Sequence, residues 1–560
     1  MKNKKNIKIL VLLAVCILSS CNDFLDRNSL VGLSEGNFWK SQEDAIMGIN
    51  SLYHANREFT NSIVMYGMMD DFTDISYQSW STGLTTGNFP ANASFYANSW
   101  GIFYKGIYRA NTAIKHIPEI EMSEDIKKRT LGEALFLRGY FYFKLWDFFG
   151  EVPLYDSPMN VDEAYKARNT NEEVYEFIVR DMTDAYSYLP ESYDQTNVGR
   201  ATKWAALAMR GKAHLWAKQY EKAAADFKEV MEKSDRKLLN NYHDLFRVAG
   251  NNNSEVIFDV QYIAEKGHGI ATDRNYGNAM GATTGSQRTR PTPKLVNSYE
   301  MIDGTPFDFN KYTNAEGETF NPDSPADWKD EASVRKLFEN RDPRLHQSII
   351  VPWAEFVGKS NIPLTYRFPV VNAPDAYVPV WKNSISLTYR FPVVNTPDAY
   401  VPVWKNGSYS WRKFVETGSV YGLQDNMPQN FPLIRLADVI LMYAEAKNEA
   451  LGAPDQSVYD AINSVRARAG MPTIPAGLDK AQMFEKIQHE RMIEFCGEGQ
   501  RYSDIRRWKI GKEVVDGVWM TEFTGVKIRQ RGFPDHYYLW PIPQTEIDLN
   551  PKLTQNPGWK

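Results

Sequence analysis

The chain has few residues of the types that build covalent or metal-bound sites. Its 560 residues include three cysteines and eight histidines. Cys16 lies in the N-terminal apolar run and Cys21 follows that run after two serines, which leaves Cys496 alone in the body of the chain. A disulfide framework and a cysteine metal cage are therefore excluded there. We expect Cys496, which follows Ile493-Glu494-Phe495, to be a packed core thiol rather than a nucleophile.

Catalytic signatures are also missing. The sequence has no G-x-S-x-G, phosphate loop or G-x-G-x-x-G, and His489-Glu490-Arg491 is not followed by the second His of a zinc protease helix. The formal charge of −5, with both signs mixed along the chain, argues against a nucleic-acid partner. We expect no metal and no cofactor. A glycosidase needs only two carboxylates, roughly 5 to 9 Å apart, so that alternative stays open.

Long hydrophobic runs are absent after the first twenty residues, which predicts no membrane-spanning helix. At the N-terminus, four lysines precede an apolar run from Ile9 to Leu18 and then Leu18-Ser19-Ser20-Cys21. The run is too short to span a bilayer, and it predicts an export signal over residues 1–20. Its ending resembles a bacterial lipobox, so we expect Cys21 to be lipidated and to anchor the chain durably. The following Asn-Asp-Phe-Leu-Asp resembles the surface-export signal of Bacteroidetes lipoproteins, which predicts an outer-membrane location facing the exterior.

Apolar residues at spacings of three and four predict two blocks of amphipathic helix. The expected helices cover residues 38–57, 100–117, 123–149, 171–189, 202–218 and 221–233, then 435–450, 457–469 and 480–508. We expect a mainly α single domain over residues 21–560. Its parts are a helical part over about 21–235, a loop-rich part with short β-prone runs over about 236–431, and a helical part over about 432–560.

Small and aromatic residues at fixed offsets predict paired helices. Gly211, Tyr220, Ala223 and Phe227 have the spacing of a tetratricopeptide hairpin, in which small residues let two helices approach. Residues 437–469 offer a second pair. A generic helical core is the alternative. Alternating charges over residues 490–507 predict a salt-linked structural network rather than a ligand site; they are Glu490, Arg491, Glu494, Arg501, Asp504, Arg506 and Arg507.

The loop-rich part contains a near-identical repeat. Residues 364–383 and 387–406 match over 20 positions with one difference, Ala373 against Thr396. Two copies are too few for a solenoid, and neither has a helical pattern. We interpret the repeat as a tandem duplication in a tolerant surface region. The functional alternative is additional exposed aromatic surface.

Sequence landmarks along almost the whole chain resemble the SusD/RagB lipoproteins. They are Cys-Asn-Asp-Phe-Leu-Asp at 21–26, Trp100-x3-Tyr104-Lys105, Leu137-Arg138-Gly139-Tyr140, Arg341-Asp342-Pro343-Arg344-Leu345, Ile434-Arg435-Leu436-Ala437-Asp438, Glu490-Arg491-x2-Glu494-Phe495 and Trp540-Pro541-Ile542-Pro543. The resemblance implies a helical, tetratricopeptide-containing fold and an outer-membrane lipoprotein without catalytic activity. It also implies a lid over a SusC-like TonB-dependent transporter that captures oligosaccharide or peptide. The repeat at 364–406 departs from the family pattern.

A sugar site needs flat aromatic faces and planar polar groups. In starch-binding members the ligand contacts loops from parts of the chain that correspond here to residues 70–80, 88–92 and 273–278. The expected ligand-binding residues are Trp80, Tyr77, Tyr276, Asn92 and Arg274, with Trp80 as the main contact. These aromatic side chains have an alternative role, in which they fold down onto the core. Trp100, on a regular helix face, is expected in the core.

The sequence therefore predicts a cell-surface lipoprotein that binds glycans and delivers them to a TonB-dependent transporter. Three alternatives remain: a peptide-binding lid, a surface glycosidase, and a structural lid that leaves specificity to the transporter.

Overall fold

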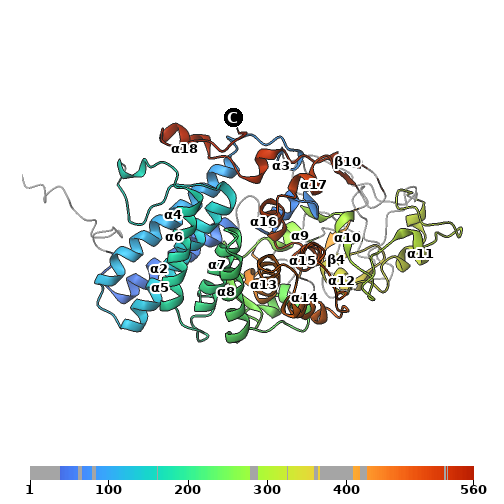
Figure 1. Cartoon of the computed structure of the whole chain (residues 1–560), viewed down its shortest axis with the longest axis horizontal. Coiled ribbons are helices and arrows are strands. Elements are labelled where there is room, and N and C mark those ends of the chain that lie inside the picture. Colours follow the sequence, from blue (N-terminus) through green and yellow to red (C-terminus); the bar gives the residue numbers. More distant parts are fainter. Residues whose placement is uncertain are drawn as a thin grey trace, which may run out of the picture.

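The computed structural model describes residues 38–60, 66–78, 83–160, 162–265, 267–277, 288–324, 326–357, 363–365, 408–416, 426–521, 525 and 527–559. Cys21, Trp80 and nearly all of the repeated segment lie outside these ranges. Figure 1 shows long helices at the left and centre and the loop-rich part at the right.

The first helical block forms largely where the periodicity predicts it. Its helices are α2 (Gln42–Thr60), α4 (Ser94–His116), α5 (Glu124–Phe149), α6 (Asn171–Tyr188), α7 (Lys203–Trp216) and α8 (Tyr220–Lys233). Side-chain caps fix several starts: Ser123 accepts from the Ile126 N–H, and Thr170 and Glu173 form a capping box. Helix α5 differs from an amphipathic helix because nearly every residue from Gly132 to Phe149 is buried. It is the central helix of the block, and its buried stretch includes four charged residues, Glu133, Arg138, Lys144 and Asp147.

The second block contains α13 (Leu436–Ala450), α14 (Gln456–Arg468), α15 (Lys480–Glu494) and α16 (Gln500–Arg507). The single helix expected over residues 480–508 is wrong, because the chain breaks between α15 and α16. Gly497 and Gly499 both have a φ of 78°, a left-handed conformation that ends a helix and suits glycine. The carboxylate of Asp70 accepts hydrogen bonds from both glycine N–H groups, at 2.8 and 3.1 Å. A residue more than 400 positions away therefore stabilises the break.

Successive helices pack as neighbours, and α8 packs against α13, which joins the two blocks. Small residues allow neighbouring helices to approach closely, as the sequence predicted. A Cβ atom on Gly211 of α7 would lie 2.7 Å from the Phe227 ring of α8, so glycine permits the close approach. Gly139 of α5 faces Met182 of α6 in the same way, with a Cβ distance of 2.9 Å. These tetratricopeptide-like pairs confirm the predicted fold class.

The part between the blocks consists of short elements joined by loops. Its helices are α9 (Thr272–Tyr276), α10 (Pro293–Ser298), α11 (Glu331–Lys336) and α12 (Arg344–Ser348); α3 (Gly83–Thr86), α17 (Gly511–Val515) and α18 (Gln544–Leu549) lie elsewhere. In the described residues the strands form five antiparallel pairs. They are β1 (Ser76–Gln78) with β3 (Thr289–Pro291), β2 (Val256–Val260) with β8 (Phe431–Arg435), β4 (Ile349–Ile350) with β7 (Ser410–Trp411), β5 (Glu355–Val357) with β6 (Pro363–Thr365), and β9 (Trp519–Thr521) with β10 (Lys527–Gln530).

A buried ion network connects the loop-rich part to α14 and α15. Glu494 contacts Arg344 at 2.9 Å and Arg435 at 2.7 Å, and also pairs with Arg468. Arg435 also reaches Glu255 and Glu498, each at 2.8 Å. The predicted structural role of this charged segment is thereby confirmed. The network fixes segments that are distant in sequence around one polar centre.

Candidate ligand-binding surface

Two of the predicted loop groups meet at the β1–β3 pair. The 3-10 helix η2 (Tyr66–Phe72) leads into β1, and α9 packs against β3. The short helix α3, which precedes the third loop group, also contacts η2. Residues that are about 200 positions apart therefore meet in one region, the β1–β3 surface, with Tyr77 of β1 directly opposite Arg290 of β3. Every residue of the two strands is itself buried, so a ligand would reach this region through the residues around them.

The individual predicted residues have different environments. Asn92 is exposed in the loop before α4. Arg274 belongs to α9, and its side chain is outside the described part. Tyr77 is only 2% exposed and Tyr276 is fully buried, with its hydroxyl donating to the Gly497 carbonyl at 2.8 Å. The burial of both rings does not fit a stacking surface for sugar, because neither offers a free face.

Three aspartates beneath this surface have three different electrostatic states. Burial raises the pKa of Asp70 to about 8, although two glycine N–H groups bind its carboxylate. Burial likewise raises the pKa of Asp71 to about 7, although hydrogen bonds from Ser76 and Thr289 act to lower it. Burial alone would also raise the pKa of Asp74, but Arg501 and Lys294 outweigh it and hold that pKa well below its ordinary value. These acids organise the surface from below and are not exposed to a ligand.

The β9–β10 hairpin adds basic residues beside β1. Arg531, directly after β10, donates from Nη2 to the Ser76 carbonyl. Gly532 forms a bridge with Thr86 of α3. The hairpin also presents Trp519, which is 44% exposed, with the Lys527 ammonium 5.4 Å from its ring centre. An exposed aromatic ring is one of the group types that we expected from the sequence in other loops.

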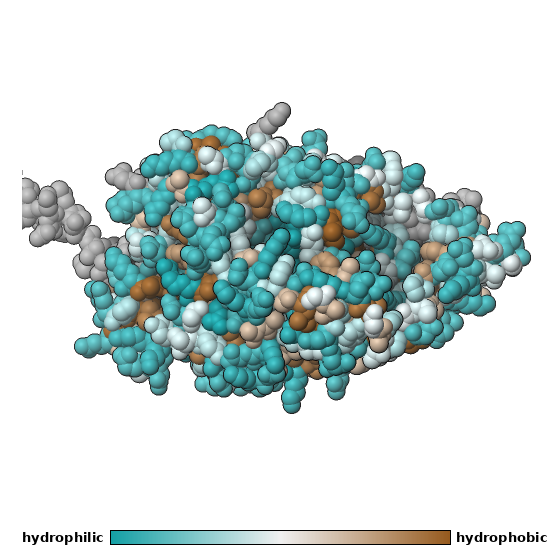
Figure 2. All heavy atoms as spheres, viewed as in Figure 1, coloured by the Kyte–Doolittle hydropathy of each residue, from teal (hydrophilic) through white to brown (hydrophobic). Residues whose placement is uncertain are grey.

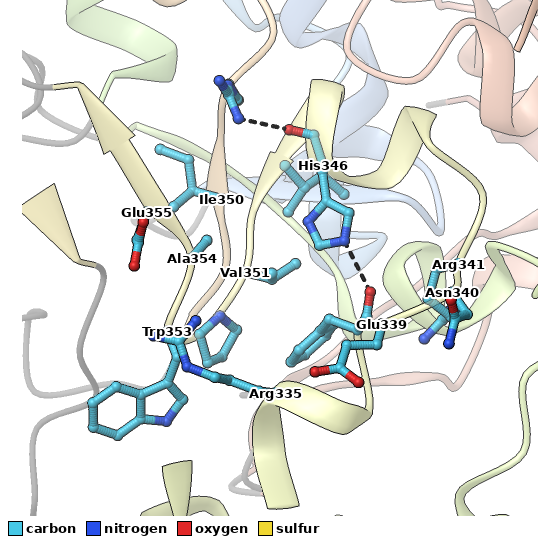
Figure 3. A pocket seen from close by; sticks show the side chains of 14 residues that line it. Arg335, Glu339, Asn340, Arg341, His346, Ile350, Val351, Trp353, Ala354 and Glu355 are labelled. Carbon is cyan, nitrogen blue, oxygen red and sulfur yellow. Dashed lines mark hydrogen bonds between the residues drawn. The ribbon is translucent and has the colours of Figure 1, made fainter. Parts of the chain in front are cut away.

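A pocket of about 670 Å³ lies farther along the loop-rich part (Figure 3). Ile349, Ile350 and Val351 contribute an apolar side, and Trp353 and Glu355 lie across the pocket from Asn340 and Arg341. The Trp353 Nε1–H is buried without a hydrogen-bond partner in the described structure. Such a combination of apolar wall, aromatic ring and planar polar groups is typical of a small-molecule site.

The polar groups of the pocket are held by backbone carbonyls. Arg341 donates to the carbonyls of Val296, Tyr299 and Leu337, at 2.8 to 3.2 Å. His346 Nε2 lies 2.9 Å from the Phe338 carbonyl, and burial lowers the pKa of this imidazole. The Arg341 side chain is therefore held in one position in the wall of the pocket, and the lowered pKa of His346 keeps its imidazole neutral near pH 7.

Short strands connect the pocket to the β1–β3 surface. Strand β4 lines the pocket and pairs with β7, and Trp411 of β7 donates from Nε1 to the Thr289 hydroxyl of β3 at 3.4 Å. The pocket and the strand surface are thus neighbours. Sequence reasoning missed the pocket because no regular pattern marks Trp353, whose φ is 63°.

Other candidate chemistry is not supported by the geometry. Cys496 is fully buried, as predicted, with its Sγ 3.3 Å from the Tyr299 hydroxyl. Trp100 is also buried, as predicted. In the ranges that the structure describes, no three His, Cys, Asp or Glu side chains are grouped to hold a metal ion. Within the same ranges, no helix has the length and apolar character needed to cross a membrane.

Comparison with known proteins gives the family. The sequence matches the SusD family over residues 254–559, which is more than half of the chain. The chain belongs to the SusD family. Residues 23–215 match a second family, described as starch-binding and associating with the outer membrane. These two matches together cover both helical blocks of this SusD-family chain apart from α8 and the last residue of α7, and they point to outer-membrane association.

Individual relatives agree with this assignment. A SusD-like protein of Formosa agariphila is 25% identical over 96% of this chain and 95% of its own length. The starch-binding protein SusD of Bacteroides thetaiotaomicron is 23% identical over 78% of this chain and 74% of its own.

Solved structures give the same result. A SusD-like protein of Bacteroides fragilis has a TM-score of 0.77 and 27% identity, covering 95% of this chain and 100% of its own. A SusD-like carbohydrate binding protein of the same species has a TM-score of 0.74 and 26% identity, and the match covers 92% of this chain and 100% of that protein. This chain therefore has a SusD-like fold.

Proposed function

We propose that this protein is a lipid-anchored lipoprotein on the outer face of the cell that binds glycan. It delivers that glycan to a SusC-like TonB-dependent transporter. Membership of the SusD family supports binding rather than catalysis, and a relative at 26% identity is described as a carbohydrate binding protein. The lipobox-like ending at Cys21 supports the anchor.

The observation that carries the proposal is the convergence of separate loop groups at one surface. Sugar-binding residue types are spread over residues 70–92 and 273–278, and the β1–β3 pair brings the two regions together. The ligand site that we propose contains Trp80, Asn92 and Arg274 at this surface. The neighbouring pocket, with Trp353 and Asn340, adds a second place for part of an oligosaccharide to bind.

The face shown in Figure 2 is mostly hydrophilic, with hydrophobic residues in small scattered groups. A glycan-binding surface fits this pattern, because sugar hydroxyls need polar partners around each aromatic contact. A site for apolar peptide side chains would instead require a continuous apolar groove.

Calorimetric titration tests the proposal. The protein from Asn22 onward, without lipid, is titrated against plant, host and microbial polysaccharides, together with Trp80→Ala and a control variant. Tyr188→Ala is the control, since Tyr188 is an exposed aromatic residue of the first helical block, at the end of α6. Binding of one glycan that Trp80→Ala removes and Tyr188→Ala retains would support the function and the site. Failure to bind any glycan, with retained capture of a peptide mixture, would refute it.

A further inference from the structure

Three arginines at the β1–β3 surface have environments that are unusual for buried cations. Arg290 is 8% exposed and Arg531 is 4% exposed, while Arg529 is half-buried. Each has a buried N–H group without a hydrogen-bond partner in the described structure: Nε of Arg290, Nη1 of Arg529 and Nη1 of Arg531. Leaving a buried donor without a hydrogen bond is unfavourable, and more so when the group is charged.

The register of the β9–β10 hairpin places Arg529 and Arg531 on the face that packs against the rest of the protein. A shift in register between Lys527 and Arg529 places Lys527 opposite Thr521 and Arg529 opposite Met520. Met520 is buried, whereas Trp519, on the other face of the strand, is exposed. Side chains alternate along a strand, so Arg529 and Arg531 share the inner face with Met520.

The inner face of the hairpin meets β1. Arg531 donates from Nη2 to the Ser76 carbonyl, and its charge is also influenced by Arg529 and by Tyr77. Tyr77 lies directly opposite Arg290 across the β1–β3 pair, so the two side chains are on one face. Arg531 therefore lies near both Tyr77 and Arg529, and Arg290 lies on the face of the strand pair that carries Tyr77.

In the part of the chain that the structure describes, the nearby carboxylates are bound mainly by other partners and form no ion pair with these three arginines. Asp74 is paired with Arg501 and Lys294, at 3.0 and 2.8 Å. Asp71 accepts from the hydroxyls of Ser76 and Thr289, both at 2.5 Å. In the described ranges none of the three arginines forms an ion pair within 4 Å. A buried cation without a counter-ion is strongly unfavourable, so a role in binding an anion explains the arrangement better than a purely structural role.

The local electrostatics point the same way. Burial lowers the pKa of Arg531 to about 10, although Asp74 and Asp71 act to raise it, and burial also lowers the pKa of Arg529. For Arg531 the cost of burial outweighs the stabilisation that Asp74 and Asp71 supply, and for Arg529 burial is the cause of the shift. This concentration of positive charge stands out in a chain with a net charge of −5.

We propose that Arg290, Arg529 and Arg531 bind an anionic group of the glycan, either the carboxylate of a uronic acid or a sulfate ester. This inference rests on the proposed glycan-binding function and specifies its ligand class. Guanidinium groups suit both anions because their parallel N–H donors match two oxygens of a carboxylate or sulfate. Half-buried Arg529 provides the contact nearest to solvent, and the two buried arginines supply the remaining charge.

The test compares three soluble polymers by calorimetry: unsulfated chondroitin, which carries only carboxylates, dextran sulfate, which carries only sulfate esters, and neutral dextran. The variant is Arg529→Gln, since a half-buried residue on a hairpin can be changed without breaking the core. Its matched control is Lys527→Gln, which removes an exposed charge from the other face of the same strand.

We expect the wild-type protein to bind at least one of the two acidic polymers more tightly than dextran, by roughly tenfold or more. Arg529→Gln should lower that affinity by about tenfold, which corresponds to about 1.4 kcal/mol, and Lys527→Gln by less than about twofold. Which acidic polymer binds distinguishes carboxylate from sulfate recognition. Equal binding of dextran and the acidic polymers, or no effect of Arg529→Gln, would overturn the inference while leaving glycan binding intact.

A thermal-shift titration with sodium sulfate, at constant ionic strength, separates failure of this inference from failure of the proposed function. Greater stabilisation of the wild type than of Arg529→Gln, without binding of any polysaccharide, would retain the anion site and refute the glycan function. Equal stabilisation of the two proteins would overturn the anion site itself.

Discussion

Glu494 provides the most stringent test of how the loop-rich part is held to the C-terminal helices. Its carboxylate is fully buried and pairs with Arg344, Arg435 and Arg468. Burial alone would raise the pKa of Glu494, but the three guanidinium charges outweigh it and hold the pKa well below its ordinary value. The perturbation is Glu494→Gln, which keeps the shape of the side chain and removes its charge.

The size of the effect depends on the partners that each arginine retains. Arg344 keeps Asp342 and Glu490, at 2.8 and 2.6 Å, and Arg435 keeps Glu255 and Glu498. Removing one partner of a buried pair costs about 3–5 kcal/mol when the other charge is left uncompensated. Since each cation here retains at least one other carboxylate, we expect a loss near the lower limit, about 3 kcal/mol.

Urea unfolding followed by tryptophan fluorescence measures this loss as a lower midpoint. The control is Glu485→Gln on the exposed face of the same helix, α15, which should change the free energy of unfolding by less than about 0.5 kcal/mol. The folded-state pKa of Glu494 is very low, so its contribution is present above the unfolded pKa near 4 and is lost only at strongly acidic pH. The difference between variant and wild type should thus be constant from pH 5 to 9. A Glu494→Gln protein within about 1 kcal/mol of wild type would refute the reasoning.

Three further predictions follow from other sites. Asp70→Asn retains an oxygen for the two glycine N–H groups but cannot ionise. Because burial raises the pKa of Asp70 to about 8 in the folded protein, wild-type stability should fall as the pH rises from about 4 to 8. Relative to wild type, the free energy of unfolding of the variant should therefore increase by about 2 kcal/mol or more between pH 5 and pH 9 in urea titrations. A difference between the two proteins that stays constant over this pH range would contradict the raised pKa of Asp70. Gly211→Ala should destabilise the protein by about 1–3 kcal/mol in thermal unfolding, because the new Cβ would lie 2.7 Å from the Phe227 ring. Gly101→Ala, at an open helical position, should instead stabilise it by about 0.5–1 kcal/mol, and equal effects would argue against close packing at Gly211. Burial raises the pKa of the Cys496 thiol, so in the protein from Asn22 onward a thiol reagent should react only after urea unfolding. Rapid labelling of the native protein would disprove that burial.

The sequence alone determined the helical framework. Periodic apolar residues located nine helical segments, and the spacing of Gly211 and Phe227 predicted the contact between α7 and α8. The charge pattern near residue 490 correctly indicated a structural network. These features are local or nearly so, since a helix is specified by residues three and four positions apart.

Only the tertiary structure decided the break between α15 and α16 and the character of the ligand-binding surface. The break depends on Asp70, which sequence periodicity cannot connect with Gly497. Tyr77 and Tyr276 have the residue type of a sugar-stacking surface, but packing across the β1–β3 region buries them. The arginines of β3 and β10 are about 240 residues apart and meet only through strand pairing and the Arg531–Ser76 contact. Residue type and spacing set which groups are available, and long-range packing sets which of them are exposed, paired or left without a counter-charge.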